Sequence, residues 1–455
     1  MNEACNRRQF LTLAAAGGLG LAAGCATAPR RLVSANAKLQ HACIGVGGMG
    51  GNDLRTLKDI EKVQIVAICD VDKATRAKAA ELLPGVRQYA DWRELFAQEG
   101  ARIDSVNIAV PDHMHAAITL TALRAKKHVY CQKPLCHDVA ECRVVADAAK
   151  AAGVVTQLGT QHASGVGDRM AVQWLREGVV GQVTRVLLCS NRSGAIANYR
   201  LEGPRPAQGM PPPETLDWNL WIGTAPERPY APGIYHPTKW RAWQDFGTGW
   251  SGDIGCHIYD AVWKGLGLTA PKTIVAEVQS SWRDSPARRG DTWPQSDHIT
   301  WVFPGNKLTG GQDLPVEWFD GEMYPPEDVR KMTGLEKYPE EASMVIGTEG
   351  ALLLPHTSGP LLFPREKFQE RPRPKLPPRN HYRHFAEACL GGEMTESHFG
   401  QTGPMAEAIL LGTVALRVPG TVLEWDARRL RFPNAPQADR LLRRTYRAGW
   451  QMAGL

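Results

Sequence analysis

Residues 40–70, QHACIGVGGMGGNDLRTLKDIEKVQIVAICD, carry the pattern that decides the fold. A short apolar run ends in the glycine-rich turn GVGGMG at 45–50, a helical pattern begins at Asn52, and a second apolar run ends at Asp70. Strand, glycine-rich turn, helix, strand and acidic residue in this order predict a βαβ unit that binds a dinucleotide. In such units the turn lets the backbone approach a pyrophosphate, and the N-terminus of the helix favours its negative charge.

The acidic residue after the second strand indicates which dinucleotide binds. Asp70 lies 20 residues after Gly50, where a carboxylate can accept hydrogen bonds from the hydroxyls of the adenosine ribose. Asp70 and Asp72 would repel a 2′-phosphate, which favours NAD over NADP. The residues of this unit predicted to contact NAD are Gly45, Gly47, Gly48, Met49, Gly50 and Asp70.

The alternation of strands and helices continues beyond this unit. Helical patterns cover 92–99, 116–125 and 139–152, and buried strands are expected over 105–110, 128–131 and 154–158. Such alternation predicts a parallel, doubly wound sheet, in which ligands bind beyond the carboxyl ends of the strands. Polar clusters follow these strands, so further contacts with the cofactor are predicted for Pro111, His115, Gln132, Lys133 and Gln161.

The composition is that of a soluble protein with two domains. A chain of 455 residues is too long for one ordinary core, and its 43% hydrophobic and 22% charged shares are typical of globular proteins. The net charge of +6 comes from scattered basic residues with no basic face of stacking aromatics, so no nucleic-acid partner is expected. The ten cysteines show no metal-ligand spacing, so neither a metal site nor a disulfide framework is predicted.

The first 37 residues predict an export signal rather than part of the fold. Residues 6–11, NRRQFL, resemble a twin-arginine signal, and the apolar stretch 11–23 is shorter than the roughly 20 residues of a membrane span. Residues 21–25, LAAGC, resemble a lipoprotein cleavage box with Cys25 as the lipidated residue, and simple cleavage at a small-residue site is the alternative. We therefore expect a periplasmic protein, exported by the twin-arginine route and either anchored by lipid or free.

These motifs together resemble the Gfo/Idh/MocA family, which includes glucose–fructose oxidoreductase and inositol dehydrogenase. The matching segments are GVGGMG at 45–50, Asp70, PDHMH at 111–115, QKP at 132–134 and GDIGCHIYD at 252–260. The resemblance implies an α/β protein with a Rossmann domain over 38–160 and a second α/β domain with an open, mostly antiparallel sheet over 161–455. It also implies C-terminal helices that pack back on the first domain and a homo-oligomer, dimeric or tetrameric, assembled through the second sheet.

Coarse patterns in the second half predict its strands and helices. Strands are expected over 183–190, 273–281, 298–303 and 351–354, and helices over 381–390 and 405–416.

The resemblance also implies the catalytic residues. The family's catalytic positions fall on Lys133, Asp253 and His257, and residues four apart on a helix share a face, so Asp253 and His257 could point into one cleft. His257 would be the general base for the substrate hydroxyl, Lys133 would stabilise the developing alkoxide, and Asp253 would position the substrate or orient the imidazole. Gln132 departs from the family, which has Glu there, and removes a negative charge near the cofactor.

The segment 217–249 is similar to an exported bacterial branch of the family. Arg241 and Lys239 could donate hydrogen bonds to a substrate, and Trp240 or Trp243 could stack on a sugar; the alternative is an interdomain loop anchored by aromatic side chains.

We expect an enzyme that oxidises a hydroxyl of a sugar, glycoside or polyol and passes hydride to tightly bound NAD. The periplasm has no dependable pool of free NAD, so the cofactor would have to remain bound. One alternative is a redox-neutral glycosidase, lyase or epimerase that works through a transient keto-sugar. A second is a catalytically silent binding protein on the same fold.

Overall fold

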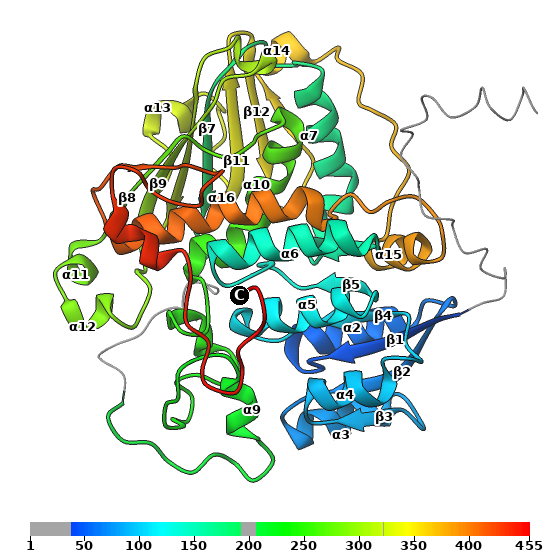
Figure 1. Ribbon diagram of the computed structural model, residues 1–455. Helices are drawn as coiled ribbons and strands as arrows, with labels where there is room; N and C mark the ends of the chain where they lie inside the picture. Colours follow the sequence, from blue (N-terminus) through cyan, green and yellow to red (C-terminus); the bar gives the residue numbers. More distant parts are fainter. Residues whose placement is uncertain (1–37, 193–205, 322) are drawn as a thin grey trace, which may run out of the picture. The chain divides into compact units, whose positions relative to one another are not determined.

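The glycine-rich segment forms the first βαβ unit of a six-stranded parallel sheet (Figure 1). The computed structural model describes residues 38–192, 206–321 and 323–455. The strand order is β3-β2-β1-β4-β5-β6, and every neighbouring pair is parallel, as expected for a doubly wound domain. The strands are β1 (Leu39–Ile44), β2 (Val63–Cys69), β3 (Arg87–Tyr89), β4 (Ser105–Ile108), β5 (His128–Cys131) and β6 (Thr156–Leu158).

Helices connect these strands as the sequence pattern predicts. They are α2 (Gly48–Lys58), α3 (Lys73–Glu81), α4 (Trp92–Glu99), η1 (Asp112–Met114), α5 (His115–Arg124) and α6 (Val139–Ala152). Helix α2 begins at Gly48 rather than Asn52, because the last glycines of the turn already adopt the first helical turn. Strand β4 ends at Ile108, two residues earlier than expected, where the chain turns past Gly45.

The second sheet is mostly antiparallel, as the family resemblance implies. Its order is β13-β12-β11-β7-β10-β9-β8-β14, and β7 and β10 form its one parallel pair among the described strands. The strands are β7 (Val183–Ser190), β8 (Thr273–Val278), β9 (Asp297–Phe303), β10 (Leu314–Asp320), β11 (Glu341–Gly347), β12 (Gly350–Pro355), β13 (Leu361–Phe363) and β14 (Leu423–Glu424). The strand expected over 273–281 ends at Val278, because residues 280–283 turn into the short helix α11.

Long helices cover this second sheet and connect it to the first domain. Helices α10 (Gly249–Leu266) and α16 (Phe399–Arg417) pack against each other and against the sheet, and α16 also packs along α6 (Figure 1). Arg143 of α6 and Glu407 of α16 form an ion pair at 2.7 Å across that contact. The C-terminal helices therefore hold the two sheets together.

Further helices are η2 (Gln161–Ser164), α7 (Val166–Arg176), α13 (Glu327–Lys331), α14 (Arg365–Phe368), α15 (His381–Cys389), α11 (Ser280–Arg283), α12 (Pro286–Arg289), η5 (Lys307–Thr309) and η6 (Pro436–Leu441).

A separate aromatic cluster forms in the segment that connects β7 and β8 of the second sheet. It lies around α9 (Trp218–Ile222) and η4 (Lys239–Ala242), and Trp218 stacks on Trp221 with ring centroids 4.7 Å apart. Its buried members include Trp221, Tyr230, Tyr235, Trp240, Trp243 and Phe246. Most tryptophans of this segment therefore fill a small core.

The described residues show neither disulfides nor a membrane-spanning helix. All eight cysteines in this part of the chain are free and buried. Within the described ranges, no helix combines the length and apolar character needed to cross a bilayer. The predicted export signal, with Arg7, Arg8 and Cys25, lies outside the described residues.

Candidate active site

A cavity of about 470 Å³ lies at the carboxyl ends of the strands of the first sheet. Its walls come from the glycine-rich turn, the loops after β2, β4 and β5, the segment around α9 and η4, and α10. The predicted site residues that line it are Gly45, Gly47, Gly48, Met49, Asp70, Pro111, Gln132, Lys133, Gln161, Trp240, Arg241 and His257. Motifs far apart in the sequence thus meet at one cavity, in the size range of ligand sites.

The glycine-rich turn has the shape that a dinucleotide requires. A Cβ on Gly45 would lie 2.3 Å from the carbonyl oxygen of Ala109, and Gly45 has a φ of +79°. A Cβ on Gly50 would lie 2.1 Å from the carbonyl oxygen of Gly45, so only glycine lets the helix pack this closely against the turn. Gly50 does not line the cavity. No side chain caps the N-terminus of α2 among the described residues, which leaves its first N–H groups for a pyrophosphate. These residues fit the predicted cofactor.

Asp70 stands beside this turn, where the adenosine ribose is expected. Its carboxylate accepts hydrogen bonds from the backbone N–H groups of Val46 and Asp72, both at 2.9 Å. Burial raises its pKa. Each carboxylate oxygen keeps a lone pair for a ribose hydroxyl, because the oxygens of a carboxylate together offer about four acceptor sites.

The amide at position 132 has a partner that the sequence patterns did not reveal, the carboxylate of Asp53. Gln132 Nε2 donates to both oxygens of Asp53, at 3.0 and 2.9 Å, and Tyr382 and Asn107 donate to the same carboxylate. Burial raises the pKa of Asp53 to about 6. A negative charge on helix α2 therefore accompanies the neutral amide at position 132. The one signal in the sequence is an acidic residue on the apolar face of α2, beside Leu54.

Lys133 and Asp253 form the centre of the site. Lys133 Nζ donates to Asp253 Oδ1 at 2.7 Å, and Arg241 Nε lies 3.7 Å from Asp253 Oδ2. The side chains of Lys133 and Asp253 are 17% and 7% exposed, so solvent screens this ion pair only weakly. Asp253 thus holds the ammonium group of Lys133, a role additional to the two that the resemblance suggested.

Asp112 is a second acidic group of the site that the sequence patterns did not single out. It lines the cavity, is buried, and accepts a hydrogen bond from Thr248 Oγ1 at 3.0 Å. Burial and the neighbouring Asp253 raise its pKa to about 8, against the opposing effect of Arg241 and Lys133. Asp112 therefore keeps its proton near neutral pH. Its position directly after Pro111, at the end of a buried strand, is the signal that could have found it.

His257 has the protonation state that a general base needs. Burial and the nearby Lys133 lower its pKa well below the usual value, so the ring is neutral at pH 7. Its Nδ1 is buried and has no hydrogen-bond partner among the described residues, while the ring lines the cavity. The rings of His356 and His162 lie 5.3 and 6.4 Å from it.

Besides Gly50, three predicted contact residues do not line the cavity. His115 is fully buried, with Nδ1 2.6 Å from the carbonyl oxygen of Pro134 and Nε2 2.8 Å from that of Val110, so it ties two loops together behind the cavity. Trp243 is 2% exposed and donates to the carbonyl oxygen of Ile234, so it anchors the aromatic cluster and cannot stack on a sugar. Lys239 is half-buried but does not line the cavity.

The described part of the chain contains no group of three or more His, Cys, Asp or Glu side chains arranged to hold a metal ion.

Family models match both halves of the chain. A model of the Gfo/Idh/MocA oxidoreductase family, NAD-binding Rossmann fold, matches residues 39–160. A second, for the C-terminal alpha/beta domain of the same oxidoreductase family, matches residues 169–298. Together the two matches span more than half of the chain.

Curated relatives are dehydrogenases of small polyols and sugars. The chain is 30% identical over 166 residues to inositol 2-dehydrogenase of Salmonella typhimurium, which is 36% of this chain and 48% of that protein. It is 28% identical over 293 residues to levoglucosan dehydrogenase of Pseudarthrobacter phenanthrenivorans, 63% of each chain. The chain thus spans about half the length of the inositol dehydrogenases that it matches.

Solved structures share the fold. An inositol dehydrogenase homolog from Azotobacter vinelandii, complexed with NADH and myo-inositol, superposes with a TM-score of 0.57 at 19% identity and covers 86% of this chain and 98% of its own. The WlbA dehydrogenase from Bordetella pertussis, in complex with NADH and UDP-GlcNAcA, gives a TM-score of 0.57 at 15% identity. The superposition covers 85% of this chain and 99% of that protein.

Proposed function

Because the chain belongs to the Gfo/Idh/MocA family of oxidoreductases, we propose that it oxidises a hydroxyl group of a sugar, glycoside or polyol and uses NAD as the hydride acceptor. The observation that carries the proposal is the Lys133–Asp253 ion pair beside the neutral ring of His257, where Lys133 and His257 line the cavity next to the glycine-rich turn. The matched dehydrogenases of inositol, levoglucosan and D-apiose support a small polyhydroxylated substrate.

The side chains divide the work of hydroxyl oxidation between them. NAD, when bound, supplies the carbon that accepts the hydride. His257 removes the hydroxyl proton, because its lowered pKa keeps the ring unprotonated at neutral pH. Lys133 donates a hydrogen bond to the same oxygen and stabilises its developing negative charge. Asp253 fixes the direction of the Lys133 ammonium group, and Arg241 is close enough to help orient a substrate hydroxyl.

A redox-neutral reaction is the second candidate, and Asp112 is the observation that favours it. Elimination of a leaving group from a transient keto-sugar needs a general acid, and Asp112 holds a proton near neutral pH beside Lys133. Glycosidase, lyase or epimerase activity would then follow without net oxidation. A silent binding protein is disfavoured, since Lys133, Asp253 and His257 are all present and meet at one site.

We also propose that the protein is exported to the periplasm by the twin-arginine route, with Cys25 lipidated or the leader cleaved, and that it forms a homo-oligomer. The paired arginines Arg7 and Arg8 support the route. Replacing both with lysine should stop periplasmic accumulation, because lysine lacks the guanidinium fork. Light scattering of the purified protein gives the oligomeric state.

The test of the function is a screen with the purified protein. Denaturation should release NAD, detected by chromatography, or the protein should bind added NAD. Sugars, glycosides and polyols are then screened for an increase in the absorbance of enzyme-bound NADH and for redox-neutral products. A protein that binds no NAD, or that turns over no member of the three classes, would refute the proposal.

A further inference from the structure

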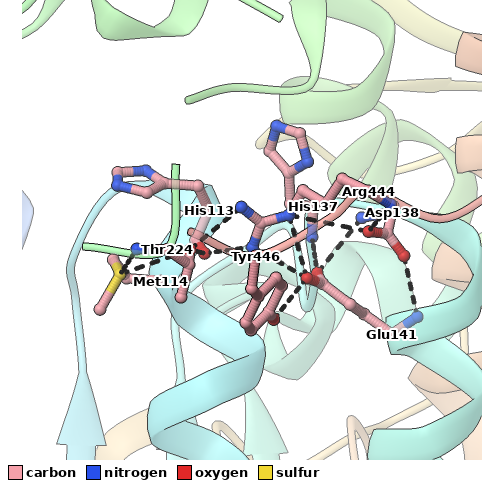
Figure 2. A network of polar contacts seen from close by, with 8 residues as sticks. All are labelled: His113, Met114, His137, Asp138, Glu141, Thr224, Arg444 and Tyr446. Atoms are coloured by element: carbon pink, nitrogen blue, oxygen red, sulfur yellow. Dashed lines mark hydrogen bonds and ion pairs between the residues drawn. The ribbon is translucent and has the colours of Figure 1, made fainter. Parts of the chain in front are cut away.

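The C-terminal segment after η6 returns to the first domain, where Arg444 contacts α6 and His113 in the loop after β4 (Figure 2). The backbone N–H of Ala140 in α6 donates to the carbonyl oxygen of Leu442 at 3.0 Å. Arg444 then enters between three segments, and its side chain is only 16% exposed. Residues 443–455 form no strand or helix, so contacts with other segments hold this part of the chain in place.

Arg444 joins three segments that are far apart in the sequence (Figure 2). Its Nη2 donates to the carbonyl oxygen of His113 at 2.5 Å, and its Nη1 donates to Thr224 Oγ1 at 3.0 Å. Its Nη2 also donates to Glu141 Oε1 at 2.9 Å, and its Nε lies 3.7 Å from Asp138 Oδ2. One guanidinium thus contacts the loop after β4, the end of α9 and the N-terminus of α6.

Two of these segments carry residues that line the cavity, and the third follows the lining residue Lys133 closely in the chain. His113 lies between the lining residues Asp112 and Met114, and Thr224 follows Trp221, another lining residue, by three positions. Asp138 and Glu141 form the capping box at the start of α6, a few residues after Lys133. The hydroxyl of Thr224 also donates to the carbonyl oxygen of His113 at 2.7 Å, so two of the walls are joined directly.

Arg447 strengthens the contact with α9. Its backbone N–H donates to the carbonyl oxygen of Thr224, and its Nε donates to that of Gly223, both at 3.0 Å. Its guanidinium also donates to Asn219, to Oδ1 at 2.8 Å and to the carbonyl oxygen at 3.0 Å. Helix α9, which presents Leu220 and Trp221 to the cavity, is therefore held from outside by the C-terminal segment.

The charges make this arrangement rigid. Arg444 lies against two acidic residues, and Tyr446 donates to Glu141 Oε1 at 2.7 Å while its ring lies 4.5 Å from the Arg444 guanidinium. Buried charges that are fully paired and hydrogen-bonded resist separation, because opening the contact would leave carboxylates unpaired in a place without water.

We propose that Arg444 and Arg447 are positioning residues that hold the α9 wall against the loops after β4 and β5, and thereby slow the release of NAD from the cavity. The inference rests on the proposed binding of NAD. Leu220 and Trp221 of the α9 wall line the cavity together with Asp112 and Lys133. Movement of this wall away from the loops after β4 and β5 would open a path for the nicotinamide half, and the C-terminal segment opposes that movement. An exported enzyme that carries its cofactor with it needs such slow release.

The experiment measures the rate at which NADH leaves the full-length protein. Protein loaded with NADH is mixed with excess NAD, and the loss of bound-NADH fluorescence is followed in wild type, Arg447→Met and Thr224→Val. We expect both variants to release NADH about tenfold faster or more, because the lost contacts act on dissociation. Arg443→Met is the matched control, since Arg443 is an exposed neighbour in the same segment, and it should release NADH at the wild-type rate.

Binding of AMP separates positioning from general loosening. AMP occupies only the adenosine half of the site, near Gly47 and Asp70, which the C-terminal segment does not contact. Its affinity should be the same in all four proteins. Wild-type release rates in both Arg447→Met and Thr224→Val would overturn the proposal, as would an equal loss of AMP affinity. A wild-type protein that binds no NADH would instead refute the proposed function. Arg444→Lys, which keeps the charge but not the fork, should give an intermediate rate.

Discussion

The pair formed by Gln132 and Asp53 predicts the effect of restoring the family's acidic residue. In Gln132→Glu, an oxygen replaces the nitrogen that now lies 2.9–3.0 Å from both Asp53 oxygens. Two unit charges about 4 Å apart repel by about 4 kcal/mol at an effective dielectric constant of about 20. Binding one proton relieves much of this repulsion, so the variant should lose about 2–4 kcal/mol of unfolding free energy near pH 8 and less in acid.

The sign of the pH dependence follows from the raised pKa of Asp53. The folded protein binds this proton up to a pKa of about 6, whereas the unfolded chain releases it near the ordinary aspartate pKa of 3.8. The unfolding free energy of the wild type therefore decreases by about 3 kcal/mol from this group as the pH rises between those values. In Gln132→Glu the folded-state pKa is higher still, so the decrease should continue above pH 6.

Urea denaturation between about pH 4 and pH 8.5 measures both effects. The matched control is the double variant Asp53→Asn/Gln132→Glu, which exchanges the amide and the carboxylate and restores one donor–acceptor pair. It should recover most of the stability that the single variant loses at high pH. A Gln132→Glu protein as stable as the wild type near pH 8, or a double variant no more stable than the single one, would contradict this reasoning.

Three further predictions concern the site itself. His257→Ala should slow the single-turnover reduction of bound NAD by about 10²–10⁴ without preventing NAD binding, and an unchanged rate would remove His257 from the mechanism. Lys133→Met should slow the same step by a comparable factor. In the double variant the two losses should not add, because both groups act on one oxygen, and additive losses would mean that they act in separate steps. Asp112 gives up its proton as the pH rises through about 8. In a redox-neutral reaction, where it is the general acid, the pH profile of kcat/KM should fall there in the wild type and not in Asp112→Asn. The same fall in both proteins would assign it to another group.

Local sequence patterns predicted the first domain well because its elements depend on short-range interactions. Helix α6 begins and ends where the periodicity indicates, since its Asp138–Glu141 capping box is encoded within four residues and Gly153 ends it with a φ of +66°. The glycine-rich turn is likewise encoded within a few neighbouring residues, Gly45 to Gly50.

Family resemblance added what periodicity could not. Lys133 and Asp253 are 120 residues apart, yet their motifs were enough to predict that they share a site, and their side chains meet at 2.7 Å. The same motifs did not distinguish Trp240, which lines the cavity, from Trp243, which is buried in the aromatic cluster. Both positions are aromatic, and only the packing of the loop decides which ring faces the cavity.

The sequence by itself determined the βαβ unit, the order of the polar clusters and the residue types of the site. Only the tertiary structure decided that Asp53 balances Gln132 across 79 residues, that Asp112 is buried beside Asp253, and that Arg444 reaches Glu141 across 303 residues. The physical reason is that helix caps, the spacing of apolar residues and glycine conformations depend on residues only a few positions apart in the sequence. The partner and protonation of a buried charge depend instead on which distant segments exclude water around it.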